Sequence, residues 1–475
     1  MTEINLSGKP FHFIGIGGIG MSALAHIVAK RDLPVTGSDI RSNHITERLA
    51  SYGARIFTSQ TAENIAQITP ETDQGNDRYP QVICSTAINE SNAEYKEAKE
   101  RGYQIYHRSD LLAALIKDYQ SVAVAGTHGK TTTSSLISYL LFHAGLDPTV
   151  IIGGEVNAWQ GNARLGQTPY LVAEADESDG SLVKHHPHFG IITNIELDHP
   201  DHYESLDQLV DIFQQFADQS KIIVACIDCP ITAKTIEADL TYSLNPESGA
   251  DYIATNVVHG AYGSEADVWE NGVKLGRMVL QLSGDHNISN ALSAVAIGRK
   301  LNLSFETIAE GLASFEGAKR RFEFKGTYQG ATLIDDYAHH PSEITCTLQA
   351  GKSRLPQYNA NRLVAIFQPH RYSRTATFLE EFAQCFAQAD VVIVTDIYSA
   401  GEANNTEIDS ETVVETIKKY HDRVYYQPDL AKLPEFLANF LTSEDLTLFL
   451  GAGNLNQTIP QLLSFDNQKI FAQVA

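Results

Sequence analysis

The sequence has little cysteine: there are five cysteines in 475 residues, and their spacing suggests no disulfide framework. Small secreted domains that depend on disulfides use this residue more densely, so we expect a reducing, cytoplasmic compartment. Cys226 and Cys229 have the spacing of a zinc or redox pair, but no second pair and no nearby histidine accompany them. Two small apolar side chains that follow a strand are the simpler interpretation of this pair.

Basic residues are also scarce, because 35 Lys and Arg face 58 Asp and Glu, which gives a net charge of −23. This balance argues against a general nucleic-acid binder and against docking on an anionic membrane. The acidic residues are concentrated in residues 171–220, which contain eleven of them and one lysine. Such a concentration is either a solvated face or a place where divalent cations bind.

Long apolar segments are absent, except that residues 11–29 contain no charged side chain. Their length and position raise the alternative of a signal peptide. However, four glycines lie within six positions of this segment, and no basic cluster precedes it. A strand, a glycine-rich turn and a helix explain the segment better, so we expect neither a signal peptide nor a membrane span.

The chain is long enough for about three domains. Short apolar strands alternate with helical segments, which predicts parallel sheets and an α/β fold. The pattern restarts near residues 118 and 320, so we predict three consecutive α/β domains, 1–117, 118–319 and 320–475. The predicted strands are 11–16, 35–38, 81–85, 121–125, 149–152, 170–173, 189–193, 221–225, 331–334, 363–367, 391–394 and 446–450, and the clearest helices are 21–30, 90–100, 131–143 and 287–301.

A glycine motif, Gly15-Ile-Gly17-Gly18-Ile-Gly20, follows the first predicted strand and opens a helix. Glycines let the backbone turn tightly and approach a diphosphate, which the helix N-terminus attracts. Asp39 ends the next strand, where a carboxylate binds ribose hydroxyls in dinucleotide sites. The motif predicts a dinucleotide or nucleotide diphosphate without specifying a reaction, and a strand–helix turn without a ligand is the alternative.

A second loop, Ala125-Gly-Thr-His-Gly-Lys-Thr-Thr-Thr133, also lies between a strand and a helix. Its backbone N–H groups and Lys130 are suited to the phosphates of a nucleotide, and the Thr131 hydroxyl is suited to magnesium. The match to a phosphate loop is imperfect, because Val124 stands where the first glycine is expected. The Gly-Lys-Thr end and its strand–loop–helix context are intact and predict ATP or GTP binding.

Two acidic loops follow buried strands of the same domain: Glu174-Ala-Asp-Glu-Ser-Asp179, and the segment from Thr193 to His202. The carboxyl ends of parallel strands share one edge of a sheet, where the phosphate loop also opens. Carboxylates and an imidazole at this edge suit magnesium that protein and phosphate bind jointly. A solvated acidic surface is the alternative for each loop taken alone.

The third domain contains Asp336-Tyr-Ala-His-His-Pro341 and Gln368-Pro-His-Arg-Tyr-Ser-Arg-Thr375. Arg371 and Arg374 are three residues apart, so on one helical turn they could present two guanidiniums to one carboxylate. The adjacent His339 and His340 suggest a metal, but consecutive residues rarely bind one ion. Helix capping or a hydrogen bond to substrate is the favoured role.

The ordered motifs AGTHGKTTT, EADESD, TNIELDH, SGDHNISNALSA, DYAHHP and FQPHRYSRT resemble the Mur ligases of peptidoglycan synthesis, over about residues 11–454. Together with GIGGIGMSALA, they look most like the branch that adds L-alanine. The resemblance implies Rossmann-like first and last domains around a P-loop ATPase-like centre. It also implies a cytoplasmic ligase that uses ATP and magnesium to join L-alanine to the lactyl carboxylate of UDP-N-acetylmuramate, through an acyl phosphate.

The resemblance also assigns residues. It implies a catalytic group made up of His128, Lys130, Glu174 and His199. It implies that Mg²⁺ is bound by Thr131, Glu174 and His199, and ATP by Gly126, Thr127, His128, Gly129, Lys130, Thr131, Thr132, Asn287, Asn290 and Arg321. It assigns the UDP part, in place of NAD, to Gly15, Gly17, Gly18, Gly20 and Asp39, and the amino acid to Arg371, Arg374 and His340.

One position departs from several related ligases, which have a carbamylated lysine where this chain has Gln214. The alanine-adding branch shares this departure, and what replaces the carbamate stays open. The alternatives are a ligase that attaches a recycled tripeptide to UDP-N-acetylmuramate, a dinucleotide-dependent oxidoreductase, and a non-catalytic nucleotide-binding partner. Since nucleotide and amino acid are assigned to different domains, we also expect domain closure.

Overall fold

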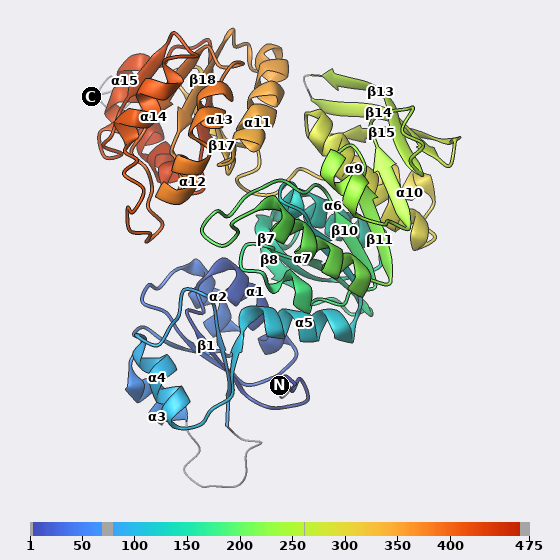
Figure 1. The fold of residues 1–475 in the computed structure, drawn as a ribbon, viewed down its shortest axis with the longest axis vertical. Helices are drawn as coiled ribbons and strands as arrows, with labels where there is room; N and C mark the ends of the chain where they lie inside the picture. Colours follow the sequence, from blue (N-terminus) through green and yellow to red (C-terminus); the bar gives the residue numbers. More distant parts are fainter. Residues whose placement is uncertain (1–2, 69–78, 261, 466–475) are drawn as a thin grey trace, which may run out of the picture. The chain divides into compact units, whose positions relative to one another are not determined.

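The computed structural model describes residues 3–68, 79–260 and 262–465 (Figure 1). The chain forms two compact units. The first unit contains Met1–Glu196, Asp207–Tyr242 and Ser293–Gly311, and the second contains Leu197–Leu206, Ser243–Leu292 and Leu312–Ala475. Parallel strands form three sheet regions, so the predicted series of three α/β domains is confirmed. The domain boundaries near residues 118 and 320 stay predictions.

The first unit begins with a parallel sheet of order β3-β2-β1-β4-β5. Its strands are β1 (Phe11–Ile14), β2 (Val35–Ser38), β3 (Arg55–Phe57), β4 (Gln81–Cys84) and β5 (Ile105–His107). The connecting helices are α1 (Ile19–Lys30), α2 (His44–Ser51), α3 (Ala62–Ile68), α4 (Ala93–Glu100) and α5 (Arg108–Asp118). Strand order reverses between β1 and β4, and ligands of such sheets bind at the carboxyl edge of this point.

The same unit contains a second, larger set of strands in the order β12-β11-β10-β6-β9-β7-β8. They are β6 (Gln120–Ala125), β7 (Thr149–Val156), β8 (Gly161–Arg164), β9 (Tyr170–Glu174), β10 (Phe189–Ile192), β11 (Ile222–Cys226) and β12 (Leu240–Ser243). All neighbours are parallel except β7 and β8. The adjacent strands β10, β6 and β9 therefore deliver the TNIELDH, AGTHGKTTT and EADESD segments to one edge.

Helix α6 (Lys130–His143) follows the phosphate loop, and α7 (Leu206–Gln219) and α8 (Pro230–Thr235) flank β11 in the chain. Helices α9 (Asp285–Lys300) and α10 (Phe305–Ala313) precede the last sheet. Among the described residues, no helix combines the length and apolar character that crossing a membrane requires.

The second unit contains an antiparallel meander and a six-stranded sheet of order β16-β17-β21-β18-β19-β20. The meander is β13 (Tyr252–Gly260), β14 (Gly263–Glu270) and β15 (Val273–Leu280), and the sheet is β16 (Glu323–Tyr328), β17 (Ala331–Asp336), β18 (Arg362–Phe367), β19 (Val391–Val394), β20 (Val424–Tyr426) and β21 (Asp445–Leu450). Its helices are α11 (Pro341–Arg354), α12 (Tyr372–Thr377), α13 (Leu379–Gln384), α14 (Ser410–Ile417) and α15 (Leu433–Phe440). Apolar clusters cover both faces of β18, which explains why its residues Leu363–Phe367 are all buried.

Candidate active site

The glycine-rich loop Gly15–Gly20 joins β1 to α1 at the point where the strand order reverses. Gly15 has a φ of +81°, a left-handed conformation that favours glycine. The first turn of α1 contains no acidic residue, and Gly18 at its start supplies no side-chain cap. The partial positive charge of this helix end is therefore left for an anion, and a diphosphate fits this requirement.

Asp39 shapes the glycine-rich loop from the adjoining strand end. Its Oδ2 accepts a hydrogen bond from the Gly17 amide at 2.8 Å, and its Oδ1 accepts one from the Arg41 amide at 3.0 Å. A Cβ atom at Gly17 would lie 2.8 Å from Asp39 Oδ2, so a side chain there would displace the carboxylate. The structure thus gives Asp39 a local role, and its contact with the UDP part stays a prediction.

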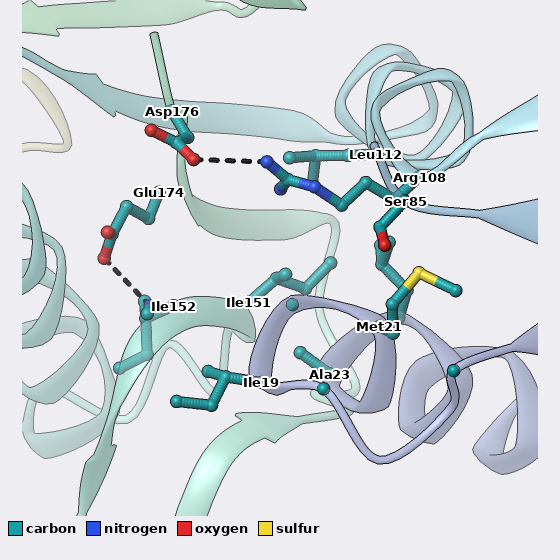
Figure 2. A pocket seen from close by; sticks show the side chains of 15 residues that line it. Ile19, Met21, Ala23, Ser85, Arg108, Leu112, Ile151, Ile152, Glu174 and Asp176 are labelled. Atoms are coloured by element: carbon teal, nitrogen blue, oxygen red, sulfur yellow. Dashed lines mark hydrogen bonds and ion pairs between the residues drawn. The ribbon is translucent and has the colours of Figure 1, made fainter. Parts of the chain in front are cut away.

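A cavity of about 310 Å³ opens beside this loop within the first unit (Figure 2). Gly15, Gly18 and Gly20 are among its lining residues. Ile19, Met21 and Ala23 of α1 lie on one side, Glu174 at the end of β9 and Asp176 just beyond it lie across the cavity, and Arg108 of α5 reaches toward Asp176. The cavity therefore joins the predicted UDP loop to the acidic loop that was predicted to lie near ATP. A nucleotide diphosphate with an appended group that extends toward the acidic loop fits this arrangement.

Arg108 is a cavity residue that sequence reasoning missed. Its Nη2 donates to Asp176 Oδ2 and to Asp179 Oδ2, each at 3.1 Å (Figure 2 shows the first of these bonds). A Cβ atom built on Gly20 would lie 3.6 Å from Arg108 Nη1, so the guanidinium also lies beside the start of α1. No local motif marks this cation, because its partners are 68 and 71 residues away.

The phosphate loop uses left-handed glycines as its pattern predicts, since Gly126 has a φ of +135° and Gly129 a φ of +81°. Strand β10 ends against this loop. The Thr127 amide donates to the Asn194 carbonyl at 3.0 Å, and the His128 amide donates to Asn194 Oδ1 at 2.8 Å. The segment after β10, which the sequence suggested for metal binding, thus also stabilises the phosphate loop.

His128 lies in this loop beside a carboxylate that sequence reasoning did not assign. Its Nε2 is 3.2 Å from Glu196 Oε2. The Glu196 amide donates to the Thr127 hydroxyl at 2.9 Å, so the same residue also contacts the loop through its backbone. Glu196 therefore fixes the position of the His128 ring, which is 13% exposed.

Lys130 begins α6 and points back over the phosphate loop. Its Nζ donates to the Gly126 carbonyl at 2.7 Å, the Thr127 carbonyl at 3.1 Å and Glu177 Oε1 at 2.9 Å. Burial favours the neutral amine, but the carboxylate of Glu177, with those of Asp176 and Glu174, outweighs burial and raises the pKa of Lys130 above its ordinary value. Lys130 therefore stays a cation at the loop where phosphates are expected.

Thr131 and Glu174 are the two predicted magnesium ligands in the first unit. Thr131 lies in the first turn of α6 and is 6% exposed, and Glu174 ends β9. Glu174 Oε2 accepts a hydrogen bond from the Gly153 amide at 2.8 Å, and its side chain lines the cavity (Figure 2). A hydroxyl and a carboxylate are hard oxygen donors of the kind that Mg²⁺ prefers, so these residues fit the ion chemically.

His199, the third predicted ligand, lies in the second unit beside a buried ion pair. It has a left-handed φ of +54°, and its amide donates to Asp198 Oδ1 at 2.6 Å. Arg374 Nε donates to the same oxygen at 2.9 Å, and neither side chain is more than 4% exposed. Burial alone would raise the pKa of Asp198, but Arg374 and His199 more than offset it and hold this pKa well below its usual range.

Arg371 and Arg374 do not share a carboxylate in the structure. Arg371 precedes α12 with a φ of +66°, so it lies outside the helical turn that the spacing predicted. Its Nη1 donates to Asp201 Oδ2 at 2.9 Å, whereas Arg374 pairs with Asp198. The two guanidiniums thus contact two carboxylates of one acidic segment, and the contact of both with an amino acid stays a prediction.

His340 caps a helix, which confirms one of the roles favoured for the paired histidines. It precedes α11, where the Ser342 amide lies 3.4 Å from its Nδ1 and Glu343 closes the capping box. The His340 ring is 5% exposed and packs edge-on against Phe378, with 4.8 Å between ring centroids. A contact with the amino acid stays a prediction.

The remaining residues that are predicted to contact ATP are Asn287, Asn290 and Arg321, and all three lie in the second unit. The two asparagines lie near the start of α9, and Arg321 precedes β16. Asn287 Nδ2 donates to the Ser283 carbonyl at 2.8 Å, Asn290 is 7% exposed, and the Arg321 guanidinium lies 5.3 Å from the centre of the Tyr337 ring. These contacts order the HNISN motif and the polar segment before the last sheet. A nucleotide contact at these residues stays a prediction.

Comparison with known families gives three consecutive matches. Residues 10–120 match the catalytic domain of the Mur ligase family, residues 124–298 match the Mur ligase middle domain, and residues 320–453 match the glutamate ligase domain of Mur ligases. These matches cover the three sheet regions in chain order, and they agree with the motifs that carried the resemblance.

Curated relatives match over nearly their whole length. The UDP-N-acetylmuramate–L-alanine ligase of Gloeothece citriformis is 59% identical over 490 residues, which covers 98% of this chain and 99% of the relative. The protein of the same name from Microcystis aeruginosa is 57% identical and covers 100% and 99% of the two chains.

Solved structures agree with these sequence matches. The crystal structure of UDP-N-acetylmuramate–alanine ligase from Thermotoga maritima is 28% identical and has a TM-score of 0.81, covering 97% of this chain and all of the other. A murein peptide ligase from Psychrobacter arcticus is 24% identical with a TM-score of 0.68, covering 96% of this chain and 98% of the other. The second likeness shows the fold alone.

Proposed function

This chain belongs to the Mur ligase family, and on that premise we propose that it joins L-alanine to UDP-N-acetylmuramate at the expense of ATP. The product is an amide between the lactyl carboxylate and the alanine amine, a step of peptidoglycan synthesis. The observation that carries the proposal is the cavity between the glycine-rich loop and the acidic loop that follows β9. This cavity can accommodate a nucleotide diphosphate-sugar whose sugar end extends toward the phosphate loop.

The first chemical step is phosphoryl transfer. An oxygen of the lactyl carboxylate attacks the γ-phosphorus of ATP, the bond to the bridging oxygen of ADP breaks, and an acyl phosphate and ADP result. Two anions must approach each other, so positive charge between them lowers the barrier. Lys130 supplies this charge when it exchanges its contact with the Gly126 carbonyl for phosphate oxygens.

The second step is acyl transfer. The neutral amine of L-alanine attacks the acyl carbon, a tetrahedral intermediate forms, and inorganic phosphate leaves with the former carboxylate oxygen while the amine loses a proton. We assign the orientation of the reacting carboxylate to His128, because Glu196 fixes its ring at the phosphate loop. Arg371 and Arg374 are the residues we propose for the carboxylate of alanine.

Thr131 and Glu174 are the residues of the first unit that would bind Mg²⁺, and the family resemblance adds His199. When bound, this ion would supply concentrated positive charge beside the triphosphate. The donor chemistry of Thr131 and Glu174 supports the proposal.

The three domains then have separate roles. We propose that residues 1–117 bind the UDP-sugar, residues 118–319 bind ATP, and residues 320–475 bind the amino acid. A cytoplasmic location is part of the same proposal, because ATP and a nucleotide-activated sugar are the co-substrates.

The test is phosphate release with UDP-N-acetylmuramate, ATP and Mg²⁺, with L-alanine, glycine, L-serine or a tripeptide added separately. We expect release that depends on L-alanine, together with a product whose mass equals UDP-N-acetylmuramate plus one alanine residue. Release with the tripeptide alone would assign the chain to the recycling activity instead. Absence of alanine-dependent release in a folded preparation would refute the proposal.

A further inference from the structure

A buried carboxyl group lies close to the carboxyl end of β2 in the first sheet, and it has no role in the proposed mechanism. Glu94, in the first turn of α4, is 0% exposed. It forms what we call the Glu94 cluster, which consists of Glu94, Ser38 at the end of β2, Asn64 of α3 and His12 of β1. Ser38 and His12 are also 0% exposed, and Asn64 is 4% exposed.

Every member of the Glu94 cluster contacts the carboxylate. The Ser38 hydroxyl donates a hydrogen bond to Glu94 Oε2, and Asn64 Nδ2 donates to Oε1 at 2.6 Å. His12 Nε2 lies 3.6 Å from Oε1. One carboxylate thus connects two strands and two helices of the same sheet domain.

The cluster is connected to the glycine-rich loop through Ser38. The Ser38 carbonyl accepts hydrogen bonds from the Gly15 amide at 2.8 Å and from the Ile16 amide at 2.9 Å. A Cβ atom at the preceding Gly37 would lie 2.6 Å from the Ile16 side chain, so this strand end and the loop are in close contact. A shift of Ser38 would therefore move the loop that begins α1.

Stability alone is a weak reason for a buried carboxyl group at this position. Taking a carboxylate out of water is expensive, and well-packed apolar residues often replace buried ions without loss of stability. A buried, hydrogen-bonded polar cluster instead favours one geometry among close alternatives. Here the selected geometry is that of residues 15–17, directly before the uncapped start of α1.

We propose that Glu94 is a positioning residue for the UDP-sugar, which fixes Ser38 and, through its carbonyl, the glycine-rich loop. This inference rests on the proposed function, because it takes the loop as the UDP-sugar site. Glu94 itself touches no substrate. Its loss should weaken binding of UDP-N-acetylmuramate while it leaves ATP binding unchanged.

The experiment compares Glu94→Gln and Ser38→Ala with wild type by calorimetric titration of UDP-N-acetylmuramate and of ATP. A glutamine offers one acceptor where the carboxylate offers two, and alanine removes the Ser38 donor. We expect the Kd for the UDP-sugar to rise about 10- to 100-fold in both variants, because the glycine-rich loop loses its fixed position and with it charge-assisted hydrogen bonds to the diphosphate. The Kd for ATP and kcat at saturation should stay within about twofold.

Glu97→Gln is the matched control, because Glu97 lies on the same helix and pairs with Arg101 at the surface. It should leave both dissociation constants unchanged. A merely structural role for Glu94 would lower Tm and leave the UDP-sugar Kd of the folded protein unchanged, which would overturn the inference. Equal weakening of ATP and UDP-sugar binding would overturn it as well.

Hydrogen exchange separates failure of this inference from failure of the proposed function, because it needs no ligand. The amides of Gly15 and Ile16 should exchange faster in Glu94→Gln and Ser38→Ala than in Glu97→Gln. Unchanged exchange would refute the role of Glu94 whatever the substrate is. A wild-type protein that neither binds nor uses UDP-N-acetylmuramate would refute the proposed function instead.

Discussion

At the scale of single residues, two cations carry most of the proposed chemistry. Lys130 stood out in the sequence because it lies in the Gly-Lys-Thr end of a loop between a strand and a helix, a pattern that predicts phosphate binding. Arg108 did not stand out, because its role comes from a cavity that forms only when α5, α1 and the loop after β9 come together. Sequence patterns predict residues within one loop well, and they miss residues whose partners come from distant loops.

Lys130→Ala should reduce kcat by about 100-fold or more, because a preorganised charge on the transferred phosphoryl group is removed. The change also leaves the buried Glu177 without its lysine, so the variant could lose stability for an unrelated reason. The double variant Lys130→Ala/Glu177→Gln removes that unpaired charge. We expect the double variant to fold with a Tm closer to that of wild type and to stay inactive in the phosphate-release assay. Recovery of activity would show that Lys130 is not needed for phosphoryl transfer.

Arg108→Ala should raise the KM for UDP-N-acetylmuramate by about 10- to 100-fold, because a charge-assisted contact beside the start of α1 is lost. The KM for ATP should change little. Arg101→Ala, which removes a surface arginine that follows α4 and pairs with Glu97, is the control and should behave as wild type. A KM for the UDP-sugar that is unchanged in Arg108→Ala would show that Arg108 only links the acidic loop to α5.

At the scale of elements, the strands that could be predicted are the buried parallel ones. All twelve predicted strands and all four predicted helices are present, with ends that differ by a few residues. The meander β13–β15 was not predicted, because exposed and buried positions of β15 alternate only over its last four residues, Arg277–Leu280, and its apolar residues Val273 and Val279 are exposed. Hydrophobic runs identify strands covered on both faces, and a half-exposed meander lacks that signal.

The phosphate loop gives an element-scale prediction through its first glycine. A side chain at Gly126 would collide with Thr193 and would also have to adopt a φ of +135°. Gly126→Ala should therefore lower the free energy of unfolding by about 1–3 kcal/mol and should weaken ATP binding by at least about tenfold, since the collision lies in the loop itself. Calorimetry with ATP and a denaturant titration measure the two effects.

Gly145→Ala is the matched control for this loop, because Gly145 follows the other end of α6. It has a φ of +76°, but a Cβ atom added there would meet no other atom within 4 Å. We expect a loss of roughly 1 kcal/mol of stability and normal ATP binding. Equal ATP affinity in the two variants would contradict the assignment of Gly126 to the nucleotide site.

At the scale of the whole molecule, the charge of −23 and the polyanionic substrates are reconciled locally. Anions are assigned to the start of α1, to Lys130 and to Arg108, while the concentrated acidic residues include the proposed magnesium ligand Glu174. The overall charge argued against nucleic acid and membranes as partners, but it could not locate the sites, because these depend on a few buried groups.

Buried neutral histidines give a prediction for the stability of the whole protein. Burial lowers the pKa of His26 to about 4, with Arg48 adding to the effect, and burial lowers the pKa of His185 to about 4, with Arg108 adding to it. The unfolded chain binds protons at these two histidines more readily than the folded protein does. The stabilisation that each neutral, buried histidine contributes is therefore complete above about pH 6.5 and is lost as the pH falls toward 4. For each histidine, the free energy of unfolding should fall by roughly 2 kcal/mol between pH 7 and pH 5.

Thermal unfolding at pH 7, 6 and 5 measures this effect. Asp335 acts in the opposite direction, because burial raises its pKa to about 6 and the folded protein therefore binds this proton more readily than the unfolded chain. The Tm of the wild type thus reflects the sum of these opposing effects. His185→Gln isolates one histidine, and its Tm should fall less between pH 7 and pH 5 than that of wild type. An identical pH dependence in the two proteins would show that His185 does not titrate as its burial implies.

In the proposed mechanism an acyl phosphate links ATP cleavage to amide formation, and the transfer of a carboxylate oxygen to phosphate is the direct test of this link. UDP-N-acetylmuramate labelled with ¹⁸O in the lactyl carboxylate is incubated with ATP, Mg²⁺ and L-alanine, and the released phosphate is examined by mass spectrometry. Because phosphate leaves with a former carboxylate oxygen, we expect one ¹⁸O atom in each phosphate released. Phosphate without the label, formed while UDP-N-acetylmuramoyl-L-alanine accumulates, would contradict it.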